Sequence, residues 1–216
     1  ADKAVLLPDG GYLDIDAVLD AAQKSNAGAI HPGYGFLSEN AEFAKRVNKE
    51  NIIWVGPSPK VISVMGDKLK AKELATKANV PTLPMTSDDK EAKKIGYPLL
   101  IKAAAGGGGK GMRIVNKEKD LKESISSAQR EAKSGFNDER IFIERYVEKS
   151  RHVEIQILGD SHGNIIHLGE RECSIQRRHQ KIIEESPSTR ISEEVRNKMG
   201  ASAVKLAKKI KYESAG

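Results

Sequence analysis

Residues 95–115 read IGYPLLIKAAAGGGGKGMRIV, and this stretch decides the fold. Two aliphatic segments, 98–103 and 112–115, flank a run of four glycines at 106–109. The aliphatic segments favour extended backbone, and the glycines favour a loop whose N–H groups can surround a phosphate. Because ordering such a loop costs conformational entropy, a purely structural linker of this composition would be wasteful.

Three kinds of phosphate loop compete for the glycine run. A Walker loop needs Ser or Thr after its lysine, but Gly111 follows Lys110. Residues 106–111 match G-x-G-x-x-G, yet the strand-like segment 112–115 stands where a dinucleotide fold needs a helix. A glycine lid between two antiparallel strands remains. Protein kinases use such a hairpin, but this chain has no HRD string, and its lysine, Lys102, precedes the glycines.

The segments before the glycine run alternate between helix and strand. Apolar periodicity predicts helices at residues 14–25, 40–50 and 67–78, and short strands at 27–31 and 52–55. This alternation, with Gly and Pro in the loops after the strands, implies an α/β fold with a parallel sheet. In such sheets ligands bind at the loops that follow the strands.

The segments after the glycine run indicate a small α+β unit inserted as a flap. A long amphipathic helix begins near residue 121, and a strand follows at 140–147. A later helix is predicted at 192–210, with Ser192 as its N-cap. In an α/β protein this helix should lead into another strand, and we expect that strand to be absent from the chain.

Two alternating strands, at 152–158 and 164–170, lie between the flap and the last helix. His152, Glu154 and Gln156 fall on one face of the first strand. A polar row of this kind is usually an ordinary solvated face. The strings ERECSIQ and RRHQK continue the polar pattern, and they favour a binding site instead.

The composition excludes several classes of protein. A single cysteine, Cys173, excludes a disulfide framework and a multi-cysteine metal site. Aromatic residues make up 5% of the 216 residues, too few for a base-stacking platform. The net charge of +6 suits an anionic ligand without choosing among them. No signal peptide or membrane-length apolar run is visible, so we expect a cytoplasmic protein, or a mitochondrial matrix protein in a eukaryote.

Several strings together resemble the biotin carboxylase component of biotin-dependent carboxylases, within the ATP-grasp superfamily. Besides residues 95–115 they are AIHPGYGFLSENAEFA, VGPSPKVISVMGDKLKAK, FIERYVEKSRHVEIQILGD and ERECSIQRRHQKIIEESPS. The glycine loop alone would be a weak signal, whereas the strings together are specific. The sequence looks most like the acyl-CoA (acetyl- or propionyl-CoA) carboxylase branch, although pyruvate carboxylase shares these strings.

The resemblance implies a fold, a reaction and partners. It implies a partial N-terminal parallel sheet at residues 1–82, an α+β ATP-grasp lid at 83–146, and the start of the ATP-grasp catalytic sheet at 147–216. In the family, ATP phosphorylates bicarbonate to carboxyphosphate, and the released CO2 is captured by N1 of biotin held on a carrier domain. The implied cofactors are ATP, Mg2+ or Mn2+, and biotin. The implied partners are the carrier, a carboxyltransferase subunit and further copies of the chain, without nucleic acid or membrane.

The resemblance also assigns residues to roles. Lys68 and Lys102 correspond to the phosphate-binding lysines, Met112 lies near the adenine, and backbone groups of 144–147 read the adenine edge. His152 corresponds to a ribose contact, Gln176 and His179 to nucleotide contacts, and Lys181 to the bicarbonate-binding residue. The implied ATP-binding set is Lys68, Lys102, Gly108, Gly109, Met112, Glu144, Arg145, Tyr146, Val147, His152, Gln176 and His179. The implied catalytic pair is Lys181 and His179, and Tyr34, Gly35 and Glu39 lie near the biotin and bicarbonate pocket.

The chain departs from the family pattern in three places, and other interpretations stay open. The segment after VPTLP is short, the family's first strand, turn and helix are missing, and the acidic metal ligands are expected beyond Gly216, so we expect no metal ligand here and an inactive fragment. The alternatives are another ATP-grasp ligase resembling carbamoyl phosphate synthetase, and a non-catalytic ATP-binding module. Nucleic-acid binding is disfavoured because Lys and Glu are mixed along the helices.

Overall fold

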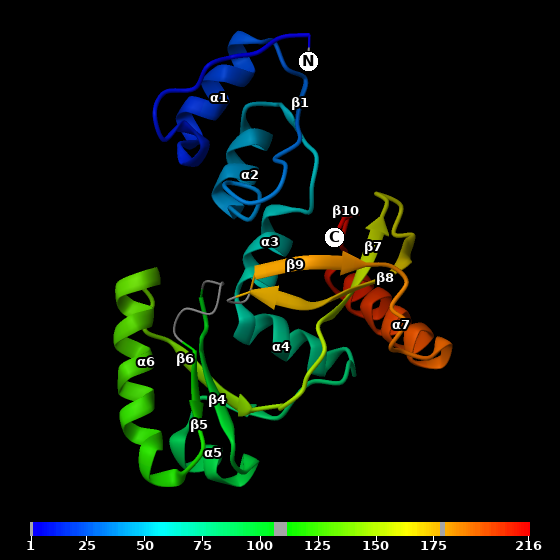
Figure 1. The fold of residues 1–216 in the computed structure, drawn as a ribbon. Coiled ribbons are helices and arrows are strands. Elements are labelled where there is room, and N and C mark those ends of the chain that lie inside the picture. The colour runs from blue at the N-terminus through cyan, green and yellow to red at the C-terminus, as the bar shows by residue number, and fades with distance from the viewer. Residues whose placement is uncertain (1, 106–111, 178–179) are drawn as a thin grey trace. The chain divides into compact units, whose positions relative to one another are not determined.

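The computed structural model describes residues 2–105, 112–177 and 180–216. The chain divides into two compact units. The first comprises Ala1–Met65, Ile157–Ile166 and Ala207–Gly216, and the second comprises Gly66–Gln156 and His167–Leu206. Figure 1 traces the chain through these segments.

The first unit begins with alternating helices and strands, as the sequence predicts. Its elements are η1 (Gly11–Leu13), α1 (Ile15–Lys24), β1 (Ala29–Ile30), α2 (Ala41–Lys49), β2 (Ile53–Trp54) and α3 (Pro59–Gly66). Strands β1 and β2 pair in parallel, with Ala29 opposite Ile53. The predicted parallel sheet is confirmed.

Side-chain caps and a shared core explain these elements. Asp14 caps α1 by accepting from two backbone N–H groups, and Asn40 caps α2 in the same way with one. The apolar faces of both helices meet the strands in a core. That core consists of Leu19, Ala22, Leu37, Phe43, Val47 and Ile52.

The second unit contains the flap expected around the glycine run. It begins with α4 (Lys68–Lys77), β3 (Met85–Thr86), α5 (Asp89–Ile95), β4 (Leu99–Ala103), β5 (Arg113–Val115), η2 (Glu118–Asp120), α6 (Leu121–Phe136) and β6 (Ile141–Arg145). The sheet order is β3-β6-β4-β5, and neighbouring strands pair antiparallel. The two strands that flank the glycine run therefore pair with each other, as predicted.

One face of this sheet forms the core of the flap. Alternate residues of β4, including the fully buried Leu99 and Ile101, point to that face together with Ile143 of β6. Helix α6 covers the face through small residues, Ala128 and Ala132 (Figure 1). The opposite face of β4 and β6 carries Lys102 and Glu144, because they occupy the intervening positions.

The last part of the chain forms a second four-stranded sheet and a helix. The elements are β7 (Val153–Gly159), β8 (Ile165–Arg177), β9 (Gln180–Glu185), α7 (Glu193–Ile210) and β10 (Ser214–Ala215), in the strand order β10-β7-β8-β9. The backbone N–H of Val195 donates to Ser192 Oγ (3.3 Å), which confirms the predicted cap.

Two expectations for this part are wrong. Strand β8 does not end at residue 170 but continues through the ERECSIQ string to Arg177. The strand expected to be absent after the last helix is present as β10, which pairs antiparallel with β7, Ser214 opposite Gly159.

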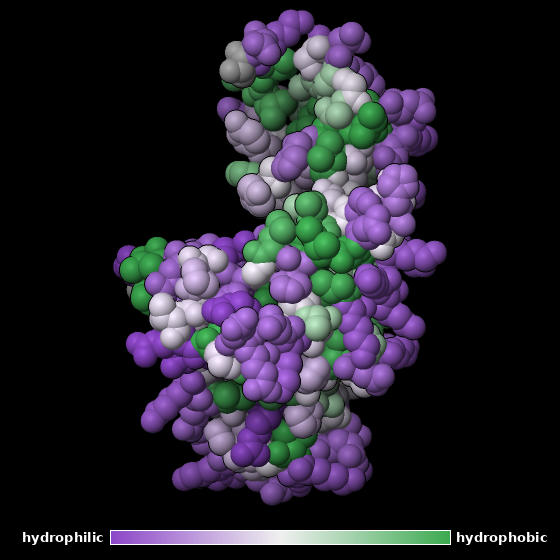
Figure 2. Space-filling model, turned by 90° about the vertical axis from the view of Figure 1, so that its right-hand side faces the viewer, coloured by the Kyte–Doolittle hydropathy of each residue, from purple (hydrophilic) through white to green (hydrophobic). Residues whose placement is uncertain are grey.

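One face of the molecule is drawn by residue hydropathy in Figure 2. Hydrophilic residues predominate on the face drawn in Figure 2, and hydrophobic residues form smaller groups between them. None of the described helices is both long and apolar enough to cross a membrane.

Candidate functional site

A buried glutamate shared by two lysines lies on the polar face of the flap sheet. Lys102 Nζ of β4 lies 2.5 Å from Glu144 Oε1 of β6, and Lys72 Nζ of α4 donates to Glu144 Oε2. The Glu144 side chain is only 6% exposed, against 29% for Lys102 and 21% for Lys72. Two ammonium groups against one carboxylate leave a net positive charge, which suits a phosphate.

The strand register brings these groups together. Leu100 pairs with Glu144, and Lys102 pairs with Phe142, so all four side chains share one face. Lys72 comes from one turn beyond Lys68 on α4, and its ammonium lies 5.5 Å from the centre of the Phe142 ring. The first turn of α4 is held to the end of β4 by a hydrogen bond from Lys68 N to Ala104 O (3.4 Å).

The protonation states follow from these contacts. Burial by itself would raise the pKa of Glu144, but hydrogen bonds from Lys102 and Lys72 and their charges outweigh it and hold the pKa below its usual value. Burial, and next the charge of Lys102, lower the pKa of the Lys68 ammonium. The hydrogen bond from Lys68 N to Ala104 O places the start of α4 beside the end of the strand that carries Lys102.

A second charged cluster lies on β7, β8 and β9. Lys181 Nζ donates to Glu154 Oε2, and Arg171 Nε donates to Glu154 Oε1 (2.6 Å). Burial would raise the pKa of Glu154, but hydrogen bonds from Lys181 and Arg171 hold it low. The bond to Glu154 raises the pKa of Lys181, so Lys181 remains a cation at neutral pH. Lys181 Nζ also lies 3.5 Å from Glu184 Oε1, so a small anion such as bicarbonate would share this ammonium with two carboxylates.

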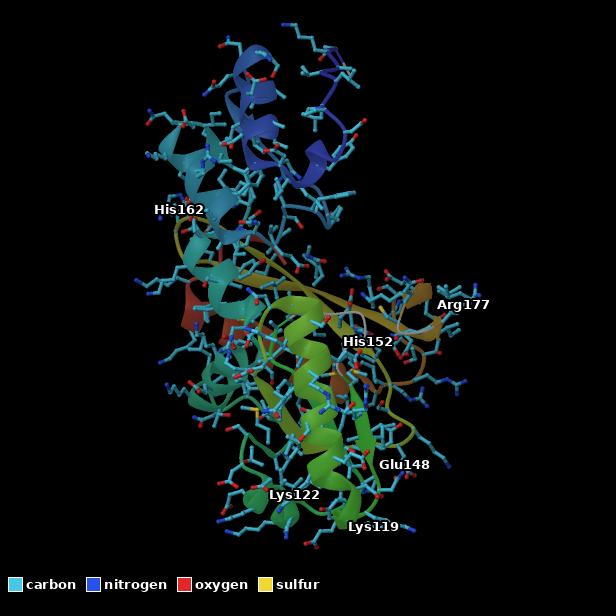
Figure 3. The ribbon with its side chains drawn as sticks, turned by 90° about the vertical axis from the view of Figure 1, so that its left-hand side faces the viewer. Lys119, Lys122, Glu148, His152, His162 and Arg177 are labelled. Atoms are coloured by element: carbon cyan, nitrogen blue, oxygen red, sulfur yellow. The ribbon has the colours of Figure 1, made fainter. Side chains whose placement is uncertain are left out.

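His152 and Gln176 meet beside this cluster. Gln176 Nε2 lies 2.8 Å from His152 Nδ1 and donates to Cys173 O (2.9 Å). The backbone of His152 is held on both sides, because its N–H donates to Ser174 Oγ (2.8 Å) and its C=O accepts from Cys173 N (2.7 Å). Figure 3 shows His152, together with Arg177 at the outer end of β8.

The other predicted ATP-binding residues lie on or near β5 and β6. Met112 is half-buried just before β5, and its carbonyl accepts from Arg113 Nη1 (3.0 Å). Arg145 points to the face opposite Glu144 and donates to Ile95 O (3.0 Å). After β6, the Tyr146 N–H donates to Pro98 O (3.0 Å), and Val147 is 42% exposed.

The remaining predicted residues lie outside the described ranges or in the first unit. Gly108, Gly109 and His179 lie outside the described residues. Tyr34, Gly35 and Glu39 belong to the first unit, in the loop between β1 and α2. Tyr34 is 93% exposed there, and Gly35 has a φ of 69°, which side-chain-bearing residues rarely adopt.

Sequence reasoning missed Lys72 and Arg171. The spacing of Lys68 and Lys72, four residues apart on a predicted helix, could have shown that both project from one side. Arg171 could have been found from the alternation of β8 once the ERECSIQ string was recognised as the continuation of the strand.

Ligand atoms of Glu154, Cys173 and Glu184 come within 4.8 Å of one another. Arg171 and Lys181 already balance these carboxylates, with Lys181 Nζ 3.5 Å from Glu184 Oε1. Burial raises the pKa of the Cys173 thiol, which disfavours the thiolate that a metal would bind. We therefore assign no metal to this group.

Comparison with known proteins places both parts of the chain. Residues 1–62 match the family described as biotin carboxylase, N-terminal domain. Residues 67–216 match the family described as carbamoyl-phosphate synthase L chain, ATP binding domain.

The individual relatives are biotin-dependent carboxylases and their parts. The chain is 52% identical over 213 residues to the mitochondrial methylcrotonoyl-CoA carboxylase subunit alpha of Dictyostelium discoideum, covering 95% of this chain and 30% of that one. It is 49% identical over 228 residues to the mitochondrial propionyl-CoA carboxylase alpha chain of Mus musculus, covering 100% and 32%. The chain thus spans about a third of the length of these relatives.

A solved structure covers nearly the whole chain. The biotin carboxylase domain of 2-oxoglutarate carboxylase from Hydrogenobacter thermophilus, in complex with ADP, magnesium and bicarbonate, is 45% identical with a TM-score of 0.91. The match covers 98% of this chain and 49% of that one. The parallel sheet described above therefore belongs to a biotin carboxylase N-terminal domain, and the antiparallel sheets belong to part of an ATP-grasp fold. On the agreement of both family models, these relatives and this structure, the chain belongs to the biotin carboxylase family.

Proposed function

We propose that the protein containing this chain uses ATP and bicarbonate to carboxylate biotin held on a carrier, through carboxyphosphate. The observation that carries the proposal is the net positive charge around Lys102, on the strand that leads into the glycine run. A triphosphate needs cations at this position. Lys68 is a second cation there, and after burial the charge of Lys102 is the next cause that lowers its pKa.

The second cluster supplies the bicarbonate half of the proposal. Lys181 stays cationic because of Glu154, and it would hold the bicarbonate anion. His152 would contact the ribose, and Gln176, which lies within hydrogen-bond distance of His152 Nδ1, would contact the nucleotide from the floor of its site. When bound, a divalent cation would supply charge neutralisation at the transferring phosphoryl group.

The proposed partners and location follow from the relatives. A biotin carrier and a carboxyltransferase part would complete the reaction, and several copies of the chain would assemble. The two mitochondrial relatives support the matrix as the location in a eukaryote, and the cytoplasm is the counterpart in a bacterium. The final acceptor would be an acyl-CoA or pyruvate.

The test is hydrolysis of ATP by the full protein with and without bicarbonate and free biotin. We expect hydrolysis to require bicarbonate and to rise with biotin. Lys102→Ala should raise the dissociation constant of ATP about a hundredfold, since it removes a charge-assisted contact to phosphate. Lys205→Ala, an exposed lysine of α7, is the matched control. Normal ATP binding by Lys102→Ala would show that the phosphate assignment is wrong.

A second candidate is an ammonia-dependent ligase of the carbamoyl phosphate synthetase type, favoured by the description of the family that matches residues 67–216. The match of residues 1–62 to a biotin carboxylase domain argues against it. The same assay, repeated with ammonia in place of biotin, separates the two candidates, because this alternative requires stimulation of ATP hydrolysis by ammonia rather than by biotin.

A further inference from the structure

Lys72 is a third lysine at the predicted phosphate site, and the proposed function gives it no task. Its ammonium donates to Glu144 Oε2, while Lys102 takes Oε1. Both lysine side chains are at least two-thirds buried, and Glu144 is nearly fully buried. Three charged groups are thus held together away from most of the solvent.

The charge balance of this group depends on Lys72. With Lys72 present, Lys72, Glu144 and Lys102 together carry one positive charge. Without it, Glu144 and Lys102 would neutralise each other, and a phosphate approaching Lys102 would meet a neutral ion pair. Charges interact strongly at this degree of burial, so the difference should be large.

The geometry also supplies a reason why Glu144 should need a second cation. An ammonium group that binds phosphate must share its donors with the phosphate or turn away from its former partner. A buried carboxylate left without a cation is strongly unfavourable. Lys72 can stay on Glu144 Oε2 while Lys102 shares its donors or turns away. The two lysines come from different elements, Lys72 from α4 and Lys102 from β4.

We propose that Lys72 is a positioning residue that balances Glu144, so that the ammonium of Lys102 stays available to a nucleotide phosphate instead of being taken up by that carboxylate. The inference rests on the proposed function only in assigning Lys102 to phosphate. The competing explanation is that Lys72 merely fastens α4 to the flap sheet through Glu144 and the Phe142 ring.

A double-mutant cycle between Lys72 and Glu144 separates these explanations. The dissociation constant of ADP is measured by calorimetry for the full protein carrying Lys72→Met, Glu144→Gln or both. We expect Lys72→Met to weaken ADP binding on the order of tenfold or more when Glu144 is present, because that carboxylate would then hold Lys102 alone. Combined with Glu144→Gln, no carboxylate competes for Lys102, and the loss should be less than about threefold. The cycle cancels any direct contact that Glu144 makes with the nucleotide.

Lys72→Arg is the matched variant, since it keeps the charge and should bind ADP within about threefold of the parent. Melting temperatures show whether each variant is folded, and Lys72→Gln replaces Lys72→Met if the latter is not. An equal loss of affinity with and without the Glu144→Gln substitution, or no loss in either case, would overturn the proposal.

A second readout does not need a nucleotide. Acetylation of Lys102, followed by mass spectrometry, reports how readily its amino group leaves the contact with Glu144. Removing Lys72 leaves Glu144 to Lys102 alone, so Lys102 should be acetylated several-fold more slowly in Lys72→Met and at the parent rate in Lys72→Arg. Unchanged labelling would contradict the inference. If the parent bound no ADP, the proposed function would fail while this measurement would still decide the role of Lys72.

Discussion

Glu144 illustrates how one residue depends on its neighbours. Glu144 lies in strand β6, whose sequence is IFIER and whose first three residues are apolar. Only 4% of Glu144 is exposed. A carboxylate in that position would normally be neutral, but Lys102 and Lys72 keep it ionised. The contribution of these ion pairs to the free energy of unfolding therefore requires Glu144 to be ionised.

We expect the contribution of Glu144 to stability to depend on pH. Because its pKa in the folded chain lies below the ordinary 4.5, the ion pairs stabilise the fold fully above that pH and lose their effect as the pH falls through the lower, folded-state value. The melting temperature of the parent should exceed that of Glu144→Gln at neutral pH, and the gap should narrow in acid. Glu123→Gln, exposed on α6, serves as the control. A gap that is the same at neutral and acid pH would contradict the expectation.

The sequence identified Lys102 but not Lys72, for a physical reason. Lys102 interrupts an apolar strand next to the glycine run, and few other roles fit such a lysine. Lys72 is one of several lysines on a short helix, and its spacing of four residues from Lys68 places both on one side without showing that this side meets the sheet. The packing of α4 against the flap sheet shows that it does.

At the scale of elements, a buried polar network fastens β8 to the loop before α7. Glu170 Oε1 accepts from Ser188 N (3.0 Å) and from Arg196 Nε (2.7 Å). Ser188 Oγ donates to Glu172 Oε2 (3.0 Å), and Glu172 accepts from Ser174 Oγ. Ser174 in turn holds the backbone of His152, so the network also fixes one edge of the second charged cluster.

Removal of Arg196 should be costly. The Glu170 side chain is 1% exposed, and Arg196→Met would leave it as a buried carboxylate without its cation. We expect a loss of about 3–5 kcal/mol in the free energy of unfolding, measured by urea titration. Lys198→Met, which breaks the exposed pair with Glu194 on the same helix, should cost no more than about 0.5 kcal/mol. Similar losses for the two variants would refute the role of the network.

The contact between α7 and β8 allows a second test at this scale. A Cβ added at Gly200 would lie 2.5 Å from His167 Cε1, whereas one added at Gly135 of α6 would meet nothing within 4 Å. Gly200→Ala should destabilise the chain by about 1–3 kcal/mol, since the ring must move. Gly135→Ala should stabilise it by about 0.5–1 kcal/mol through helix propensity. If urea titration showed that Gly200→Ala stabilises the chain, as Gly135→Ala is expected to do, the close approach of His167 would be wrong.

Two of the differences between the predicted and the observed elements share a cause. Helix α3 follows the string GPSP, which is typical of a turn, yet Ser58 Oγ accepts from Val61 N (3.4 Å) and Pro59 suits the first helical position. The predicted strand at 164–170 ends just after Gly169, whose φ of 88° lies in the region that glycine adopts readily. In both places a residue typical of turns stands inside or at the start of a regular element.

At the scale of the whole molecule, the family could be recognised because its strings are spread along the chain. Each string alone is weak, but together they predicted the fold class that the comparisons confirm. The domain boundaries at residues 82 and 146 stay a prediction. Contacts between residues distant in sequence form the compact units: residues 157–166 and 207–216 join the first unit although they come late in the chain. Local patterns carry no information about such pairing.

Cys173 has a practical consequence for experiments on this chain. It is the only cysteine in the sequence, it is fully buried, and burial raises its pKa, so its thiol reacts slowly with maleimides. A cysteine introduced at Lys122, exposed on α6 (Figure 3), would be the one thiol that a dye labels readily within these 216 residues. A fluorophore attached there would report on the environment of α6 without removal of the natural cysteine.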